Sequence, residues 1–309
     1  MEVFLTIVLG SVAGLVGLLC FLKLRRASEL RFPPERSGWI PWLGCAVPFG
    51  KAPLHFIQET REMLGDVFTI HVTGRRMTFV ARHGDFKASF FQNGSTSFQA
   101  AVQPFTMKAA GLSTASFFKY HSSIHDAVKA KLVPSYIAKL CPKLCRDLYG
   151  SFRKLGDDGE MDLMSFVRRT MFDSVVRQLF GADNVPETET GMRELERKFV
   201  KFDEDFEYGT QLPEFLIRDW SECKYWLLSF FKKMVEKLRG STIRGGNDQL
   251  MIEKLMETVD PASAHNYALL FLWASQANAI PVVFWCLGHI LSSPDLYRVL
   301  QNDVLNIDF

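Results

Sequence analysis

Charge is missing from one long stretch of this sequence, because no Asp, Glu, Lys or Arg occurs between Pro261 and Pro294. The chain as a whole also has no large excess of charge of one sign. Its formal net charge is +2, which gives no reason to expect a nucleic acid or an acidic partner. Internal repeats and low-complexity tracts are absent as well. With 309 residues, the chain is long enough for one large domain or two ordinary ones.

Cysteine is scarce, and its spacing excludes the common metal and redox motifs. The sequence has six cysteines, and none of them stands in the Cys-x-x-Cys spacing of zinc ribbons and redox sites. Cys141 and Cys145 lie four residues apart, and this pair would need further ligands to hold a metal. We therefore expect no metal site of cysteines, and free thiols in a reducing compartment.

The N-terminus carries a membrane signal. Residues Val3 to Leu22 form an uncharged, mostly apolar run that is long enough to cross a bilayer as a helix. Only Glu2 precedes this run, whereas four basic residues follow it closely. A cleavable signal peptide has the reverse order of charge. The pattern predicts a transmembrane signal anchor over residues 1–22, with the rest of the chain in the cytosol. The basic residues are Lys23, Arg25, Arg26 and Arg31.

The remaining sequence predicts a mainly α-helical fold with a small β-hairpin or sheet. Residues 23–48 are basic and proline-rich, which is typical of a stiff linker. A short helix is predicted over Leu54–Leu64. A hairpin follows, in which Val67–Val72 and Met77–Val80 flank a glycine-containing turn. From Asp85 onward the pattern is helical.

Glycine and proline divide the helical part. Residues from Gln92 to Ser116 are rich in Ala, Ser, Thr and Phe, and we expect a long irregular loop there. Further breaks are expected wherever turn-forming residues cluster. These breaks fall at Asn93-Gly94, Gly111, Pro134, residues 156–159, Pro186, Pro213, residues 239–246 and Pro261.

A polar cluster interrupts the uncharged segment. Ser275, Gln276 and Asn278 stand just before Pro281, and polar groups in such a segment cost free energy unless they are hydrogen-bonded or contact a ligand. In a helix, Pro281 would remove one backbone hydrogen bond and displace the carbonyl of Ala277. The segment is predicted to be a long helix buried in a helical domain, with a second membrane span as the alternative. The 27 phenylalanines fit either a plain core or a pocket for a large lipophile.

Several features of the chain together resemble the microsomal cytochrome P-450 monooxygenases. They are the anchor, the proline-rich hinge, the hairpin, the series of helices and the long uncharged helix that the polar cluster interrupts. Three stretches are similar to the sterol 7α-hydroxylase branch of that superfamily. They are Trp39-Ile-Pro-Trp-Leu-Gly44, Gly50-Lys-Ala-Pro53 and residues 273–285. A fourth, residues 203–213, is similar to members of the branch that act on oxysterols. The resemblance implies a haem cofactor, electrons from NADPH through a partner reductase, and an oxysterol substrate. It also implies a single-pass protein of the endoplasmic reticulum membrane that contacts membrane lipid and binds no nucleic acid.

The resemblance also assigns roles to residues of the uncharged helix, in and around its polar cluster. The family's acid–alcohol pair falls on Ala277 and Asn278, and neither residue is an ordinary general acid. Asn278 is interpreted as orienting a water or dioxygen, with Ser275 as a second candidate and Ala274 beside the haem. The alternative is that Asn278 only satisfies the carbonyl freed by Pro281.

Other predicted contacts lie elsewhere in the chain. His121 and His125 occupy roughly the place of the family's haem-propionate contacts, although the pair could equally be a solvated helix face. As a metal site this pair lacks a third ligand. By the same resemblance, four residues are expected to line the sterol pocket, or else to serve only in packing. They are Val102, Phe105, Phe206 and Leu212.

The family's haem-ligating cysteine motif does not occur in these 309 residues. No cysteine has the context Phe-x-x-Gly-x-x-x-Cys-x-Gly, and in the family that loop follows the central helix. Residues 49–309 are therefore expected to be the N-terminal two-thirds of a haem-thiolate monooxygenase domain, inactive alone. The rival hypotheses are a non-catalytic membrane-anchored fragment that binds lipid, and an enzyme of the same branch that acts on another sterol or a prostanoid.

Overall fold

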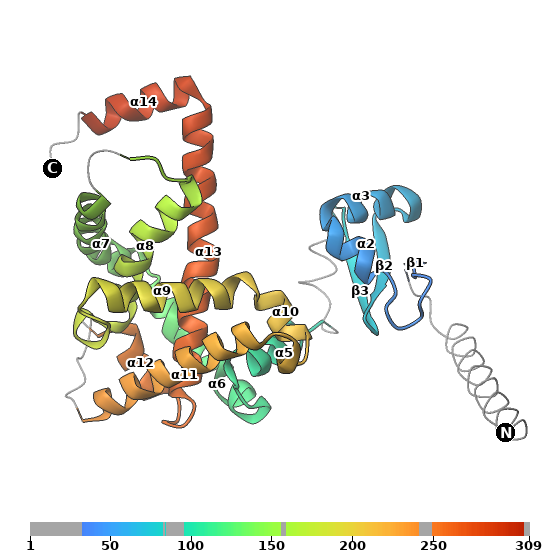
Figure 1. Cartoon of the computed structure of the whole chain (residues 1–309), viewed down its shortest axis with the longest axis horizontal. Coiled ribbons are helices and arrows are strands. Elements are labelled where there is room, and N and C mark those ends of the chain that lie inside the picture. The colour runs from blue at the N-terminus through green and yellow to red at the C-terminus, as the bar shows by residue number, and fades with distance from the viewer. Residues whose placement is uncertain (1–32, 83, 85–95, 156–158, 241–248, 306–309) are drawn as a thin grey trace, which may run out of the picture. The chain divides into compact units, whose positions relative to one another are not determined.

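A computed structural model describes residues 33–82, 84, 96–155, 159–240 and 249–305. The contacts divide the chain into two compact units, residues 1–97 and residues 98–309. The predicted anchor at Val3–Leu22 and the first part of the predicted linker lie outside the described residues. Figure 1 shows the helices and strands of each unit.

The N-terminal unit is a small sheet with two helices. Strand β1 (Glu35–Arg36) pairs in parallel with β2 (Val67–Val72), which pairs in antiparallel fashion with β3 (Arg75–Val80). Helices α2 (Ala46–Lys51) and α3 (Pro53–Leu64) precede the hairpin. The hairpin and the helix predicted from Leu54 are confirmed. Strand β3 begins two residues earlier than predicted.

The hairpin turn is tight because its two central residues adopt left-handed backbone conformations. Thr73 has a φ of 47° and Gly74 a φ of 79°, which places positive φ at both positions of a two-residue turn. Val72 therefore pairs with Arg75, and the register of the whole hairpin follows from that pair.

A small apolar core holds this unit together. It consists of buried side chains from the sheet and the helices, with Phe56 in T-shaped contact with Phe49. Arg36 closes one side, because its guanidinium lies 4.3 Å from the centre of the Phe56 ring and donates a hydrogen bond to Thr60 Oγ1 at 2.8 Å. The buried core residues are Cys45, Phe56, Phe68, Ile70 and Val72.

The C-terminal unit is helical. Its elements are α5 (Phe98–Ala110), α6 (Thr114–Lys131), α7 (Pro134–Leu155), α8 (Leu163–Phe180), η1 (Ala182–Asn184), α9 (Glu189–Glu204), α10 (Phe206–Gln211), η2 (Glu214–Leu216), α11 (Arg218–Arg239), α12 (Met251–Thr258), α13 (Ala264–Ser292) and α14 (Pro294–Leu305).

Several expected breaks coincide with helix ends. Pro134 begins α7, and Pro186, Pro213 and Pro261 lie between helices. Gly111, with a φ of 67°, follows the last residue of α5, where only a glycine takes that conformation without strain. The expected break at Asn93-Gly94 lies outside the described residues.

The predicted loop from Gln92 to Ser116 is wrong over most of its length. Helix α5 occupies Phe98–Ala110 despite Pro104 inside it. Alanine, glutamine, methionine and lysine are strong helix formers, and they outnumber the breakers in this segment. Ala109 and Ala110 are completely buried at its end, so tertiary packing also stabilises the helix.

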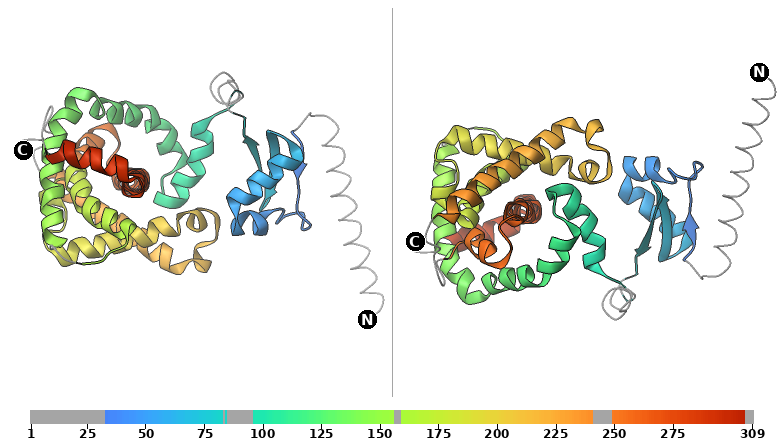
Figure 2. Two further views of the ribbon diagram at one scale, coloured as in Figure 1. Left: turned by 90° about the horizontal axis from the view of Figure 1, so that it is seen from above. Right: turned by 90° about the horizontal axis from the view of Figure 1, so that it is seen from below.

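Helix α13 is the axis of the C-terminal unit. It packs against α5, α8, α9, α11 and α12. Viewed along its length it lies among the surrounding helices (Figure 2). Its N-terminal half contributes fully buried residues to a large core, including Ala268, Leu269 and Leu272.

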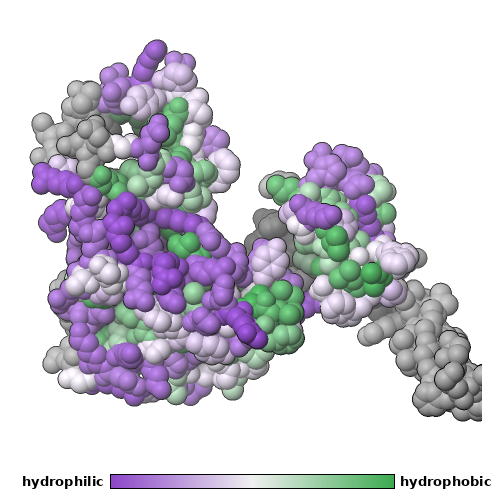
Figure 3. Space-filling view, viewed as in Figure 1, coloured by the Kyte–Doolittle hydropathy of each residue, from purple (hydrophilic) through white to green (hydrophobic). Residues whose placement is uncertain are grey.

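The second half of α13 departs from the prediction of a helix buried throughout. Beyond Ile280 its side chains are partly or largely exposed, and Val282 and Trp285 each have an exposed fraction of 62%. Figure 3 shows apolar atoms uncovered along this part of the helix. Fewer of the described helices reach this far along the axis. Among the described residues, α13 alone is long and apolar enough to cross a membrane by length and composition.

Candidate functional site

The polar cluster of α13 points in two directions. Ala274 and Asn278, four residues apart, share an exposed face of the helix, whereas Gln276 and Ile280 share a buried face. Two of the predicted site residues therefore stand together on an accessible surface. Gln276 instead faces the interior between α8, α9 and α13.

The Asn278 side chain is held by its own helix. Its Nδ2 donates a hydrogen bond to the carbonyl of Ala274 at 2.9 Å. The alternative that Asn278 satisfies the Ala277 carbonyl freed by Pro281 is wrong, because the bond goes one turn back instead. The helix also continues through Pro281 as far as Ser292. The Oδ1 atom of Asn278 takes no part in the bond to Ala274. It stays available as a hydrogen-bond acceptor on the exposed face of the helix.

Ser275 is also tied to the backbone. Its hydroxyl donates to the carbonyl of Leu272 at 2.8 Å. Such a bond to the preceding turn is the usual way for a helix to accommodate serine in its interior. Ser275 keeps its acceptor lone pairs but has no free proton to donate in this rotamer. Of the two predicted residues, Asn278 is therefore the better placed to accept a hydrogen bond on the exposed face of α13.

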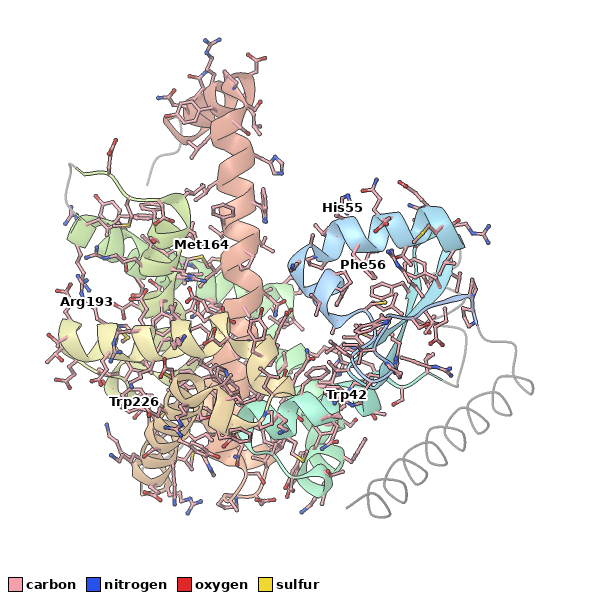
Figure 4. All side chains as sticks on the ribbon, turned by 45° about the vertical axis from the view of Figure 1, so that its right-hand side comes forward. Trp42, His55, Phe56, Met164, Arg193 and Trp226 are labelled. Atoms are coloured by element: carbon pink, nitrogen blue, oxygen red, sulfur yellow. The ribbon has the colours of Figure 1, made fainter. Side chains whose placement is uncertain are left out.

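A cavity of about 40 Å³ lies on the buried side of the same turn. Met164 of α8 is beside α13 at this place in Figure 4. The polar atoms that reach the cavity come from all three surrounding helices. Its lining residues are Met164, Arg168, Phe172, Glu196, Phe199, Val200, Asp203, Gln276, Ala277, Ile280 and Pro281.

Two carboxyl groups of α9 are half-buried at this cavity. Burial raises the pKa of Asp203 above its usual range, and Arg168 together with a hydrogen bond from Trp273 only partly offsets the effect. Burial likewise raises the pKa of Glu196, against the opposing charges of nearby arginines. Sequence reasoning missed both carboxyls, because helix packing brings them to α13 and, for example, Asp203 lies seventy residues from its partner Trp273.

The residues predicted to line a sterol pocket lie on α5 and around α10, which are in contact. Phe206 stacks on Trp273 of α13, with ring centres 4.2 Å apart and planes inclined by 10°. Val102 is partly buried, whereas Phe105 and Leu212 each expose 37% of their surface. Phe206 is thus near the polar cluster of α13, and the roles of all four residues remain predictions.

The two predicted propionate contacts differ in their surroundings. His121 is partly buried against Phe117, with ring centres 5.0 Å apart. His125 is largely exposed, and its Nδ1 lies 3.7 Å from Asp126 Oδ1. Within the described part of the chain, no group of three or more His, Cys, Asp or Glu residues could hold a metal ion. The role of the two histidines stays a prediction.

Comparison with known proteins decides the family. A model of the cytochrome P450 family matches residues 33–307. The chain belongs to the cytochrome P450 family. The fold agrees, because the cyanobacterial CYP120A1 solved with bound retinoic acid superimposes with a TM-score of 0.62. That likeness covers 80% of this chain and 57% of the other, at 16% sequence identity.

Curated P450 relatives include sterol hydroxylases. The 24-hydroxycholesterol 7-alpha-hydroxylase of Homo sapiens is 33% identical over 95% of this chain and 63% of the relative. The protein of the same name from Mus musculus is 35% identical, over 99% of this chain and 65% of the relative. Mouse cytochrome P450 7B1 is 25% identical over 92% of this chain. The resemblance drawn from residues 39–44, 50–53 and 273–285 is confirmed, and the chain spans less than two-thirds of the length of these relatives.

The accessible face of α13 suits one side of a P450 haem. Ala274 has a small side chain that lets a flat macrocycle approach the helix, and Asn278 offers a polar atom on the same face. Within the sequence given, none of the six cysteines has the haem-ligand context, so the residues present supply no thiolate ligand for a haem.

Proposed function

We propose that this P450 chain forms the anchor and distal part of a membrane-bound monooxygenase that hydroxylates an oxysterol at the 7α carbon. The observation that carries the proposal is the 33–35% identity to two 24-hydroxycholesterol 7-alpha-hydroxylases along nearly the whole chain. Other sterol-hydroxylating relatives, such as the 12-alpha-hydroxylase of Oryctolagus cuniculus, are 27% identical. The proposal includes a role in cholesterol catabolism and bile acid synthesis, which is supported by the names of these sterol-hydroxylating relatives.

Haem, when bound, would supply the binding and activation of dioxygen, with electrons from NADPH through a partner reductase. This chain's own residues would shape the space around that chemistry. Ala274 would leave room above the macrocycle. Asn278, fixed by its bond to Ala274, would hold a water or the oxygen ligand through its Oδ1 atom. His121 and His125 would lie near the propionates.

The proposed substrate contacts come from two segments that meet. Val102 and Phe105 on α5, with Phe206 and Leu212 around α10, offer mostly apolar surface to a sterol ring system. We call the surface formed by these four residues the proposed substrate wall. Trp273 supports it, because the indole ring stacks on Phe206. A rigid aromatic backing of this kind fixes the shape of a pocket better than flexible side chains do.

Location at the endoplasmic reticulum membrane, with a single span and the body on the cytosolic side, is part of the proposal. It rests on the uncharged run Val3–Leu22 and the basic residues that follow it. A glycosylation site inserted after Pro294 tests the topology. The proposal requires that this site stay unmodified, whereas a two-span protein would expose it to the lumen.

Product analysis tests the activity. A polypeptide that continues through a haem-ligand cysteine loop is combined with the reductase, NADPH and 24-hydroxycholesterol, and 7α-hydroxylated product is sought by mass spectrometry. Product from another sterol or a prostanoid alone would favour the same-branch alternative. The 309 residues by themselves are expected to give no thiolate-type Soret band with carbon monoxide, because no cysteine has the required context. Lipid binding without turnover would favour the non-catalytic alternative.

A further inference from the structure

Lys224 of α11 is a buried cation, with an exposed fraction of 4%. Its Nζ donates one hydrogen bond to the carbonyl of Lys108 at 3.0 Å and another to Glu214 Oε1 at 2.6 Å. Lys108 belongs to the last turn of α5, and Glu214 is the first residue of η2. Because a buried ammonium group costs free energy unless it is paired and hydrogen-bonded, both contacts are needed to keep Lys224 in place. We call these two contacts the Lys224 bridge.

The contact with α5 caps the C-terminus of that helix. The last four carbonyls of an α-helix have no partner within it. In α5, Lys224 completes the carbonyl of Lys108, and Asn266 of α13 donates to the carbonyl of Ala110 at 2.6 Å. A positive charge near a helix C-terminus also interacts favourably with the helix dipole. Side chains from two neighbouring helices thus satisfy the end of α5.

Helix α5 depends on such contacts because it is short and contains a proline. It has 13 residues, and isolated helices of about that length are marginal in water even when they contain strong helix formers. Pro104 lies inside it and has no backbone N–H to donate. Loss of a cap that another helix supplies is therefore expected to loosen α5.

The contact with η2 holds the segment that follows α10. The Tyr225 hydroxyl donates to Glu214 Oε2 at 2.9 Å, so neighbouring residues of α11 hold both oxygens of this carboxylate. The hydrogen bond from Lys224 lowers the pKa of Glu214, which keeps the carboxylate charged at neutral pH. Helix α10 lies directly against α11 one turn earlier, because a Cβ atom at Gly209 would lie 2.1 Å from Cε2 of Trp220. The α10–η2 segment is therefore fixed to the same face of α11 as Lys224.

The proposed substrate wall is built from the two segments that the Lys224 bridge joins. Val102 and Phe105 lie on α5, whereas Phe206 begins α10 and Leu212 follows its last residue. Helices α5 and α10 are also in contact with each other. Lys224 bonds a backbone carbonyl and Glu214, so it can affect a bound sterol only through the positions of these segments.

We propose that Lys224 is a positioning residue for the sterol site, which fixes the spacing of α5 and the α10–η2 segment through its bonds to Lys108 and Glu214. The inference rests on the proposed monooxygenase function, because that function gives the wall its substrate. A rigid sterol ring system makes its full set of apolar contacts only when both segments keep their places. Loss of the bridge is therefore expected to weaken sterol binding more than it slows turnover of bound sterol.

Hydrogen exchange in the full chain tests the bridge without turnover. Lys224→Met keeps an apolar side chain of similar length and removes the ammonium group. We expect amide exchange to become about tenfold faster both in α5 and in residues 212–217, because each segment loses a hydrogen bond to a charged group. The amide of Leu227, which is fully buried in α11, reports global unfolding and is expected to stay protected. Faster exchange in one segment alone, or in neither, would overturn the proposal.

Two matched variants separate the contacts. Asn266→Ala removes the cap at Ala110 but leaves η2 held, so it is expected to loosen α5 alone. Tyr225→Phe removes one bond to Glu214 but leaves the bond to Lys108, so it is expected to loosen residues 212–217 alone. Glu214→Gln is a milder substitution at a side chain with an exposed fraction of 38%, which serves where Lys224→Met unfolds. It is expected to loosen both segments by a smaller factor, and a response confined to residues 212–217 would contradict the bridge.

The positioning role is tested in the haem-loaded enzyme at a temperature where wild type and variant are both folded. Lys224→Met is expected to raise KM for 24-hydroxycholesterol by about tenfold, with a change in kcat of less than about threefold. An unchanged KM would overturn the positioning role, even with faster exchange in both segments. Failure of the proposed function is a separate outcome, because it abolishes 7α-hydroxylated product in the unmodified enzyme and leaves the exchange pattern intact.

Discussion

The indole Nε1 of Trp273 donates a hydrogen bond to Oδ1 of Asp203 at 3.1 Å and so joins α13 to α9. The same indole stacks on Phe206, the first residue of α10. One side chain therefore links the half-buried carboxyl, the polar turn of α13 and the segment expected to contact substrate. This link is local in space although its partners lie up to seventy residues apart in sequence.

Replacing Trp273 by Phe should separate the two contacts. The ring still stacks on Phe206, but the hydrogen bond to Asp203 is lost, which removes an effect that lowers the pKa of that carboxyl. The pKa of Asp203 is therefore expected to rise further. We also expect the free energy of unfolding to fall by about 1 kcal/mol. Infrared titration of the protonated carboxyl and urea unfolding measure the two effects, with the exposed Trp285→Phe as control.

The raised pKa of Asp203 gives stability a definite dependence on pH. Above the usual carboxyl pKa of about 3.9 and up to its raised value, the folded state binds more protons at this site than the unfolded state does. Its contribution to stability is therefore complete below that window and is lost as pH rises through it. Asp203→Asn removes this loss. We expect its unfolding free energy relative to wild type to increase as the pH rises above the usual carboxyl pKa of about 3.9. A constant or decreasing difference in urea titrations would contradict the assignment.

Lys224 is expected to be a strong determinant of stability. Its ammonium group is almost fully buried, and it donates to the carbonyl of Lys108 at 3.0 Å and to Glu214 at 2.6 Å. It thereby joins α11 to α5 and η2. Lys224→Met should lower the free energy of unfolding by about 2 kcal/mol, because it leaves both acceptors without this partner. It should also raise the pKa of Glu214, which the hydrogen bond from Lys224 now lowers.

The matched control is Tyr225→Phe. The Tyr225 hydroxyl bonds the same carboxylate at 2.9 Å, but its side chain is largely exposed. We expect a loss of less than about 0.5 kcal/mol for this exposed contact. Equal losses in the two variants, measured by thermal unfolding, would show that burial of Lys224 does not matter.

The proposed substrate wall predicts opposite behaviour for Phe206 and Leu212. Phe206→Ala removes the stacking on Trp273 and should destabilise the fold by about 3 kcal/mol or more. Leu212→Ala alters a side chain with an exposed fraction of 37%, so stability should change little while affinity for an oxysterol falls. Equilibrium titration with sterol measures the affinity. Unaltered binding in Leu212→Ala would remove that residue from the wall.

Local patterns in the sequence predicted the elements that local physics determines. The turn at Thr73-Gly74, the helix at Pro53–Leu64 and the breaks at Gly111 and Pro213 depend on nearby residues and appear where expected. Helix α5 was missed because a segment rich in Ala, Ser, Thr and Phe was interpreted as an irregular loop, whereas buried Ala109 and Ala110 stabilise the helix by tertiary packing.

The site was predictable only in part for the same reason. The sequence indicates that Ser275, Gln276 and Asn278 form a polar cluster. The cluster by itself does not show that Gln276 lies on a buried face of the helix and Asn278 on an exposed face. The spacing of Leu272, Gln276 and Ile280 does separate the two faces. These residues are four apart and share one helix face, which indicates that Gln276 is buried with its two apolar neighbours. The partners on α9 gave no signal, since their proximity arises from helix packing.

The most direct measurement offers 24-hydroxycholesterol, cholesterol and a prostanoid together to the haem-loaded enzyme with reductase and NADPH, and identifies every product by mass spectrometry. The account predicts that 24-hydroxycholesterol is consumed first and yields the 7α-hydroxylated product. It also predicts that Asn278→Ala lowers product formed per NADPH. Preferential oxidation of a different substrate, or hydroxylation at another carbon, would contradict it.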